Sequence, residues 1–260
     1  PRGAACRRPT GSSEESMRAI LTYHSIDDSG SPISVPPAVF AEHVQWMAGG
    51  RVRVLPLVDL LAHDPDDPAD SIAITFDDGF RNFRDAAAAL LAARLPVTLF
   101  VVSGHVGGSN TWGGRAEPDI PTLPLLTWAE LERLAADGVT IGAHTRTHPR
   151  LTTLSPESIA EEMDGCVREL GTRLGVRIDH FAYPYGAANE DVAALAGRRF
   201  KAAVTTRFAP LARGDAPMLM PRLDMYYLRQ PDAIGAWGTP GFRRKLWSVR
   251  FRRQVREVLS

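Results

Sequence analysis

Two short clusters of residues in this chain have the types and spacing needed to hold a metal ion beside a base. The first is Asp77-Asp78, which follows the apolar run 71–76 and directly precedes Gly79. A short apolar run that stops at a turn signal predicts a buried strand. Two adjacent carboxylates repel each other unless a cation or hydrogen bonds hold them. One carboxylate is therefore a candidate metal ligand, and the other is a candidate general base.

The second cluster has two histidines four residues apart, His144 and His148, directly after the apolar run 139–143. If this segment coils, both imidazoles can converge on one cation, and Pro149 ends the turn. Two imidazoles and one carboxylate leave a position open for water or substrate, as in catalytic zinc sites. Alone, the aspartates would fit a solvated turn and the histidines a surface loop. Because each pair follows an expected buried strand, together they favour a metal site.

A third segment, 181–186, has the sequence Phe-Ala-Tyr-Pro-Tyr-Gly. In chain order, 75–79, 144–148 and 181–186 resemble the first three motifs of the polysaccharide deacetylases, carbohydrate esterase family 4, whose shared unit is the nodulation-factor deacetylase homology domain. The resemblance covers about residues 17–224. The early Tyr23-His24 and the Ala-Tyr-Pro of the third motif resemble the exopolysaccharide and cell-surface sugar branch. This resemblance implies a metal-dependent hydrolase that removes N-acetyl groups from an amino sugar.

The resemblance also implies a role for each matching residue. Asp78, His144 and His148 would be the ligands of one divalent metal ion, with Zn²⁺ expected first and Co²⁺, Mn²⁺ or Ni²⁺ as alternatives, since nitrogen and oxygen ligands accept several metals. Asp77 would be the base that takes a proton from water. Tyr185 would present its backbone N–H to the oxyanion, and its ring would shape the substrate pocket. Without the motif order, the Tyr185 segment would be only a turn after a strand.

The chain departs from the family pattern at two functional positions. Ala182 stands where the third motif usually carries an arginine that orients the catalytic aspartate. The later Asp-Trp and Leu-x-His motifs are not found, and no histidine follows His180. A partner for Asp77 and a general acid must therefore come from elsewhere in the chain.

Arg222 is the candidate partner of Asp77. It follows an expected strand that starts near 218, and a guanidinium in a neighbouring barrel position would keep Asp77 ionised. The alternative is a surface pair between Arg222 and Asp224. His24 is the candidate general acid, because it ends the first strand and the first and last strands of a closed barrel are neighbours. The alternative for a single histidine at a strand end is a structural role.

A long loop, 103–126, is rich in Gly and Pro and follows an expected strand. Long loops in compact domains are usually functional or disordered, and this one leaves the end of the strand where the site is expected. Trp112 is a candidate surface for sugar stacking, although it would serve equally as a loop anchor packed on the barrel. His105 is a second candidate substrate contact.

Strand-like and helix-like runs alternate along the chain, which predicts βα units around a mainly parallel sheet. We expect one α/β domain, a (β/α) barrel, and the resemblance narrows it to the distorted (β/α)7 form. Strands are expected at 18–23, 52–55, 72–76, 97–102, 139–143, 178–183, 200–205 and from 218. Helices are expected at 37–47, 82–93, 155–174, 189–197 and after the capping box that begins at Thr127.

Composition excludes several classes of protein. The chain has 260 residues, 44% hydrophobic content and zero formal net charge, which gives no global case for a nucleic-acid partner. Its two cysteines, Cys6 and Cys166, do not form a disulfide framework, and no stretch is apolar and long enough to cross a membrane. The expected partner is an N-acetylated glycan or a lipid-linked sugar.

Three regions are expected along the chain. Residues 1–16 form a polar leader, disordered or left over from cloning, without the apolar core of a secretory signal, and Met17 would be the natural start. Residues 17–240 form the barrel. Residues 241–260 form a basic amphipathic helix that closes the barrel or lies on an anionic membrane surface. We therefore expect a cytoplasmic protein, with membrane association through this helix as an extension.

Two alternatives to de-N-acetylation stay open. The same metal and water would also hydrolyse an ester or amide of another acyl group. The second alternative is a catalytically inactive carbohydrate-binding homologue, which the missing motifs suggest. The presence of Asp77 argues against it, because a binding module needs no base beside a metal.

Overall fold

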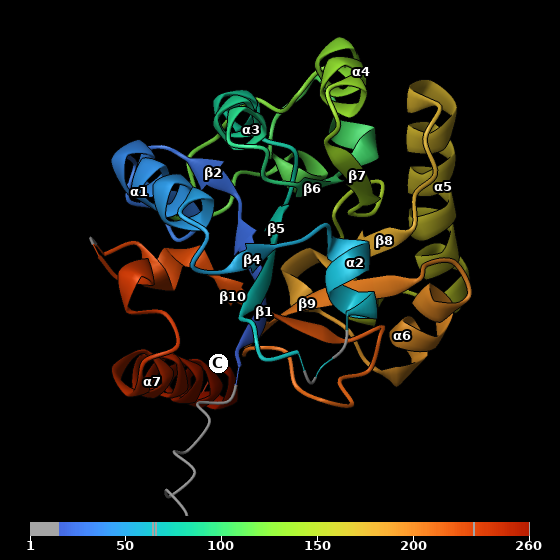
Figure 1. Ribbon diagram of the computed structural model, residues 1–260. Helices are drawn as coiled ribbons and strands as arrows, with labels where there is room; N and C mark the ends of the chain where they lie inside the picture. Colours follow the sequence, from blue (N-terminus) through green and yellow to red (C-terminus); the bar gives the residue numbers. More distant parts are fainter. Residues whose placement is uncertain (1–15, 64, 66, 231, 260) are drawn as a thin grey trace, which may run out of the picture.

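A closed barrel of seven parallel strands forms the centre of the computed structural model, which describes residues 16–63, 65, 67–230 and 232–259 (Figure 1). Each strand pairs with the next, and β5 pairs back with β1 to close the ring. This confirms the predicted distorted (β/α)7 barrel. The order around the ring is β1 (Arg18–Tyr23), β10 (Met220–Asp224), β9 (Ala202–Phe208), β8 (His180–Ala182), β7 (Thr140–Ala143), β6 (Val97–Val101) and β5 (Ser71–Phe76).

Helices surround the barrel on its outside (Figure 1). They are α1 (Pro37–Ala48), α3 (Phe83–Ala92), α4 (Trp128–Ala136), α5 (Pro156–Leu174), α6 (Glu190–Gly197) and α7 (Pro240–Leu259). The expected capping box at the start of α4 is present, with Glu130 N–H donating to Thr127 Oγ1 and Thr127 N–H donating to Glu130 Oε2. The remaining elements are short: α2 (Leu57–Ala62), β2 (Ser25–Ile26), β3 (Ser34–Val35) and β4 (Arg53–Val54).

Side chains fill the inside of the barrel and close one of its ends. Because side chains alternate across a strand, every second residue points inward. Leu57 and Leu60 of α2 pack into the inner apolar cluster, so this helix covers the end at which the strands begin. The site must therefore lie at the other end. The strand residues of the inner cluster are Ile20, Ala73, Phe100, Ala182 and Val204.

The last two strands differ from the sequence-based expectation. β9 continues to Phe208 rather than stopping at 205, and β10 begins at Met220. Met220 lies opposite Val204, whereas Arg222 lies opposite Phe208, so β9 bulges between these two points. Arg222 is consequently inside a strand and not after one. Helix α2 was also not predicted, because its six residues are too few to show a helical period.

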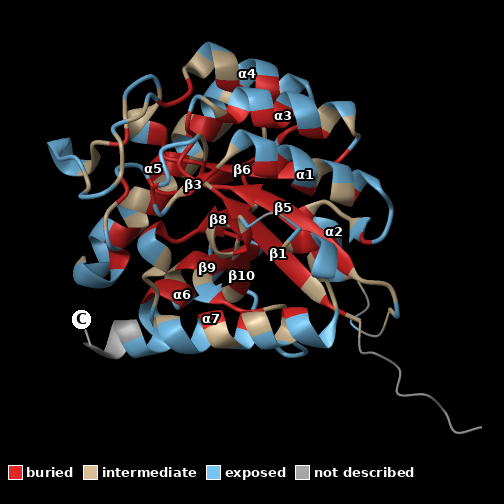
Figure 2. Cartoon of the chain, turned by 90° about the vertical axis from the view of Figure 1, so that its left-hand side faces the viewer, coloured by how far each residue is buried: buried red, intermediate tan, exposed pale blue. Residues whose placement is uncertain are grey.

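The two ends of the predicted domain division have different outcomes. Residues 1–15 of the expected leader, Cys6 among them, lie outside the described residues. Helix α7 packs on the barrel through its buried residues Phe242, Leu246 and Val249 (Figure 2). In the described part of the chain, no helix is both long and apolar enough to span a bilayer.

Candidate metal centre and active site

The strand ends opposite α2 bring the predicted site residues together around one cavity. Asp77 and Asp78 follow β5, His144 follows β7, and Tyr185 lies in the turn after β8. These residues and His148 line a cavity of about 110 Å³ at the mouth of the barrel. Parallel strands place all their carboxyl ends at the same edge, which explains why motifs far apart in the sequence meet here.

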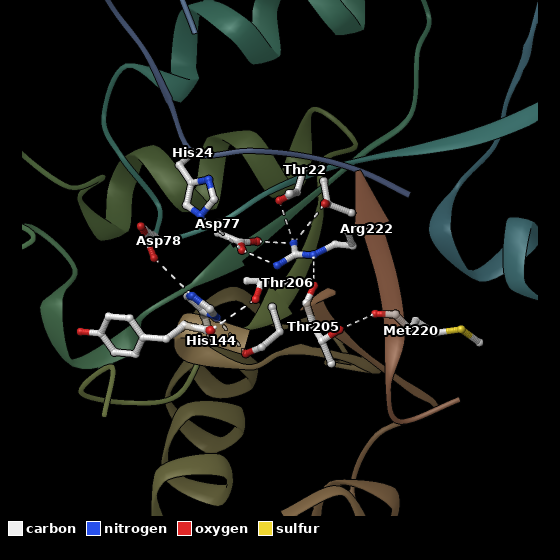
Figure 3. Close-up of polar contacts among 12 residues, drawn as sticks. Thr22, His24, Asp77, Asp78, His144, Thr205, Thr206, Met220 and Arg222 are labelled. Atoms are coloured by element: carbon white, nitrogen blue, oxygen red, sulfur yellow. Dashed lines mark hydrogen bonds and ion pairs between the residues drawn. The ribbon is translucent and has the colours of Figure 1, made fainter. Parts of the chain in front are cut away.

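Asp78, His144 and His148 form a group of converging metal-ligand atoms. Their ligand atoms lie within 4.8 Å of one another, and all three residues are buried. Asp78 Oδ1 lies 3.2 Å from His144 Nε2 (Figure 3). The same oxygen lies 3.4 Å from His148 Nε2. A tetrahedral zinc ion with bonds of about 2.1 Å needs ligand atoms about 3.4 Å apart. The spacing of these three atoms therefore suits one divalent cation.

The surroundings of the two imidazoles also fit a cation. His144 Nδ1 lies 2.8 Å from the carbonyl oxygen of Ala182, so its N–H donates there and leaves Nε2 free to bind. The ring of His148 is held between those of Trp112 and Tyr185, with centroids 4.4 and 4.7 Å away. Asp78 Oδ1 is buried and accepts no hydrogen bond from the described residues. A buried carboxylate oxygen without a hydrogen bond is costly, and a bound cation would satisfy it.

The charge of Asp78 is favoured even without a cation. Burial raises the pKa of its carboxyl, but the contacts with His144 and His148 outweigh burial and hold this pKa well below its usual range. Burial lowers the pKa of His148, whereas for His144 burial is outweighed by the contacts with Asp78 and the charge of Asp77, which raise its pKa. An ionised carboxylate and a neutral imidazole are the forms that bind metals.

The loop that carries the two histidines is fixed by an acidic residue of α5. Glu162 accepts the backbone N–H groups of Arg146 and Thr147 at 2.9 and 2.8 Å. The Thr145 hydroxyl accepts the N–H of His148 at 3.0 Å, which closes the expected coil. Glu162 was not among the predicted site residues, because nothing in the helical pattern of α5 separates it from the other acids of this helix.

Arg222 makes a bidentate ion pair with Asp77. Its Nη1 and Nη2 donate to Asp77 Oδ1 and Oδ2 at 2.7 and 2.6 Å, and both side chains are at least 98% buried (Figure 3). Burial raises the pKa of Asp77, but the charge and hydrogen bonds of Arg222 outweigh it and leave this pKa below its usual value. The surface pair of Arg222 with Asp224 is therefore wrong. Asp224 accepts the N–H of Tyr226 instead.

Three further groups hold the Arg222 side chain. Its Nη1 donates to the hydroxyls of Thr22 and Thr75 at 2.9 and 3.3 Å, and its Nε donates to the carbonyl of Thr205 at 2.9 Å. None of these threonines was among the predicted site residues. Strand periodicity carried the signal for two of them: Thr75 stands two residues before Asp77, and Thr22 two before the strand-ending histidine, so both point into the barrel.

His24 lies beside the same carboxylate. Its Nε2 is 3.8 Å from Asp77 Oδ2, which is ion-pair range but too long for a hydrogen bond, and the side chain is 18% exposed. It lines the cavity with Asp77 and Asp78. The structure thus places this histidine where a proton donor can reach both the cavity and the aspartate.

The long loop 103–126 folds over the cavity. Trp112, Glu117 and Ile120 line the cavity, and Tyr185 Oη donates to Glu117 Oε1 at 2.9 Å. His105 lies edge-on against Trp112, with ring centroids 5.0 Å apart, and is not among the lining residues. Glu117 had no sequence signal, because only the folded loop brings it to the site.

Strained backbone is concentrated at this site. Of the seven non-glycine residues with positive φ in the described chain, four belong to the site: Asp78 (71°), Thr145 (64°), His148 (62°) and Tyr185 (58°). Such conformations cost free energy and persist only where the surroundings impose them. Each of the four follows a strand end and turns the chain sharply, which aims the neighbouring side chains into the cavity.

Comparisons with known proteins agree with this geometry. Residues 64–200 match the family model described as polysaccharide deacetylase. YxkH of Bacillus subtilis (strain 168) is 25% identical over 223 residues, or 84% of this chain and 75% of that protein. The chitooligosaccharide deacetylase of Bradyrhizobium sp. (strain ANU 289) is 28% identical over 137 residues, which are 52% of this chain and only 54% of that protein. IcaB from Ammonifex degensii has the same fold, with a TM-score of 0.71 at 24% identity, covering 86% of this chain and 97% of that chain.

The buried ion pair predicts a large loss of stability when Arg222 is removed. Arg222→Ala should lower the free energy of unfolding by about 3–5 kcal/mol, because it leaves Asp77 buried and unpaired. Arg199→Ala is the control, since Arg199 pairs with Asp164, whose side chain is 48% exposed, and should cost about 1 kcal/mol or less. Urea unfolding of both variants measures the difference, and similar losses would contradict the central role of the Asp77 pair.

The ligand group predicts one divalent ion per chain. Elemental analysis after loading with Zn²⁺ should give this stoichiometry. Asp78→Asn or His148→Gln should weaken zinc binding more than about 100-fold, because even losing a residue that only orients a metal ligand can cost about 100-fold. Asp77→Asn should keep the ion, since Asp77 is outside the ligand group. Full zinc content in His148→Gln would show that the ligands are different.

Proposed function

The chain belongs to the polysaccharide deacetylase family, and from this premise we propose that it is a metal-dependent hydrolase that removes N-acetyl groups from an amino sugar. The substrate would be a bacterial glycan or its lipid-linked precursor. One observation carries the proposal: the ligand group Asp78-His144-His148 and the Asp77–Arg222 pair share one cavity. A carbohydrate-binding module would need neither a buried base nor a guanidinium to orient it.

Asp78, His144 and His148 would hold the metal, with Zn²⁺ as the proposed ion and Co²⁺, Mn²⁺ or Ni²⁺ as alternatives. A bound divalent cation would supply Lewis acidity, which polarises the acetyl carbonyl and lowers the pKa of water. Asp77 then accepts a proton from the attacking water. Arg222 keeps this carboxylate ionised and fixes its orientation through hydrogen bonds from Nη1 and Nη2.

Two other groups would act on the acetyl group and the leaving amine. The N–H groups of Gly186 and Ala187 already donate within their turn, whereas that of Tyr185 has no acceptor among the described residues and is free for an oxyanion. His24 would donate a proton to the leaving amine from beside Asp77.

The size of the cavity indicates which part of the substrate enters it. A volume of about 110 Å³ is well below the range of about 300–1,000 Å³ that is usual for sites enclosing a whole small ligand. This suits an acetamido group but not a sugar ring. The sugar would therefore stay at the mouth, against Trp112 and the ring of Tyr185, and His105 would contribute through its contact with Trp112.

Helix α7 has a second apolar face that supports a membrane contact. Trp247, Phe251 and Val255 point away from the barrel and are 68%, 54% and 41% exposed. In sequence the helix also carries Arg243, Arg244, Lys245, Arg250 and Arg252 around this stripe. An apolar stripe flanked by cations is typical of helices that lie in the interface of an anionic membrane. We propose that α7 brings the enzyme to membranes that hold lipid-linked sugars.

Replacing the proposed base should abolish turnover and spare the metal. Asp77→Asn should lower acetate release from N-acetylglucosamine oligomers or lipid-linked acetamido sugars by about 10²–10⁴-fold. Asp59→Asn, an exposed change on α2 at the closed end, should leave the rate unchanged. Chelation should stop the wild type and Zn²⁺ should restore it. Metal-dependent hydrolysis of other acyl groups alone would move the proposal to an esterase or amidase, and metal binding without any hydrolysis would favour a binding protein.

The outward face of α7 predicts binding to anionic vesicles. The double variant Trp247→Ser/Phe251→Ser should reduce cosedimentation with phosphatidylglycerol vesicles by at least about 10-fold, because two aromatic anchors are lost. Val58→Ser removes an exposed apolar residue, 44% accessible, from helix α2 and should have no effect. Equal binding by all three proteins, or no preference for anionic over neutral vesicles, would contradict the contact.

A further inference from the structure

A second and larger hollow adjoins the acetyl-sized cavity. This groove has a volume of about 360 Å³ and lies between the turn after β8, the bulged strand β9 and helix α7. Thr206 lines both the groove and the cavity. Gly186, on the same wall, lies so close to Thr206 that a Cβ there would collide with it. The groove and the cavity are therefore separated by little more than one strand residue and one turn.

Arginines dominate the charge of this groove, and two of them have no acidic partner among the side chains that the structure describes. Arg207 donates to Asp215 Oδ1 at 2.6 Å, so its charge is offset. Arg250 and Arg253 have no carboxylate within ion-pair distance among the described residues. Asp224 feels the charge of Arg253 but accepts the N–H of Tyr226. Two cations lining a hollow without acidic partners favour a bound anion.

The guanidinium of Arg253 is held in place before any ligand arrives. It lies 5.4 Å from the ring centroid of Tyr227 and 6.0 Å from that of Phe208. Stacking between rings limits the rotamers of a long side chain, so less entropy is lost when it binds a ligand. Thr206 and Gln254 also line the groove, and their hydroxyl and amide groups can bind polar groups of a sugar.

We propose that this groove is a subsite for a negatively charged group of the glycan, next to the sugar that loses its acetyl group. Its volume reaches the range of about 300–1,000 Å³ that is usual for small-ligand sites. Arginine forks suit carboxylates and phosphates, so the anion is a uronate carboxylate within the chain or the phosphate of a lipid-linked sugar. The inference rests on the proposed function, because the acetyl cavity fixes which sugar stands beside the groove.

The test compares acetate release from substrates that differ in charge. The substrates are a neutral N-acetylglucosamine tetramer, a tetramer in which N-acetylglucosamine alternates with glucuronate, and N-acetylglucosamine linked through diphosphate to a short polyprenol. The wild type should show a higher kcat/KM with at least one anionic substrate than with the neutral one, and high salt should reduce this preference. The substrate that shows the preference separates a carboxylate from a phosphate source.

Two variants assign the preference to the groove. Arg253→Gln and Arg250→Gln should each raise KM for the preferred anionic substrate by about 10-fold, leave kcat unchanged and leave the neutral substrate unaffected. Arg250 is exposed, so its replacement does not endanger the fold. Arg133→Gln, which removes an exposed charge from α4, is the matched control. Equal effects on neutral and charged substrates, or an equal effect of Arg133→Gln, would overturn the subsite.

Calorimetric binding keeps this test independent of turnover. The same tetramers are titrated into wild type and both groove variants, with inorganic phosphate as a competitor. Tighter binding of an anionic tetramer that is lost in Arg253→Gln supports the subsite even if no acetate is released, in which case only the proposed reaction fails. Equal affinity for neutral and anionic tetramers would refute the subsite whatever the enzyme hydrolyses.

Discussion

The ion pair between Asp77 and Arg222 is the constraint on which the centre of this barrel depends. Removing a carboxylate and a guanidinium from water is expensive, and it is tolerated only when the geometry is good and the remaining donors are satisfied. Here the guanidinium also binds two threonine hydroxyls and a backbone carbonyl. Its partners come from β1, β5 and β9, and the arginine itself from β10. One side chain therefore links four of the seven strands.

The barrel interior explains how room is made for this arginine. Ala182, where the family resemblance implies an arginine in the third motif, points inward as a small residue of the inner cluster. The guanidinium enters from β10 instead and lies over the ring of Phe100, 5.9 Å from its centroid. Gly142 gives that ring its space, because a Cβ there would lie 2.5 Å from Phe100 Cδ1. The position of the orienting arginine therefore depends on the small residues around it.

The barrel and the residues of the candidate metal centre could be predicted from the sequence, but the surroundings that fix them could not. Paired carboxylates and paired histidines at the ends of apolar runs have a local signature, so Asp77, Asp78, His144 and His148 could be named from spacing alone. The role of Arg222 needed a topological argument, and the expectation that Arg222 follows a strand was wrong, because β10 continues through Pro221 to Asp224. Glu117 and Glu162 reach the site only through loop and helix packing, for which no short sequence pattern exists.

Helix α2 seals the end of the barrel beneath the site, and the inner cluster of Phe100 and its neighbours fills the space between. Under the proposed reaction, the acetate is formed at the bottom of a cavity that is closed below and covered at its mouth by the sugar. The glycan must leave, or lift away, before the acetate can diffuse out. Product release is then ordered, and the enzyme would have to release its polymer after every deacetylation instead of sliding along it. Such an enzyme works distributively, leaving scattered free amines along a chain rather than continuous blocks.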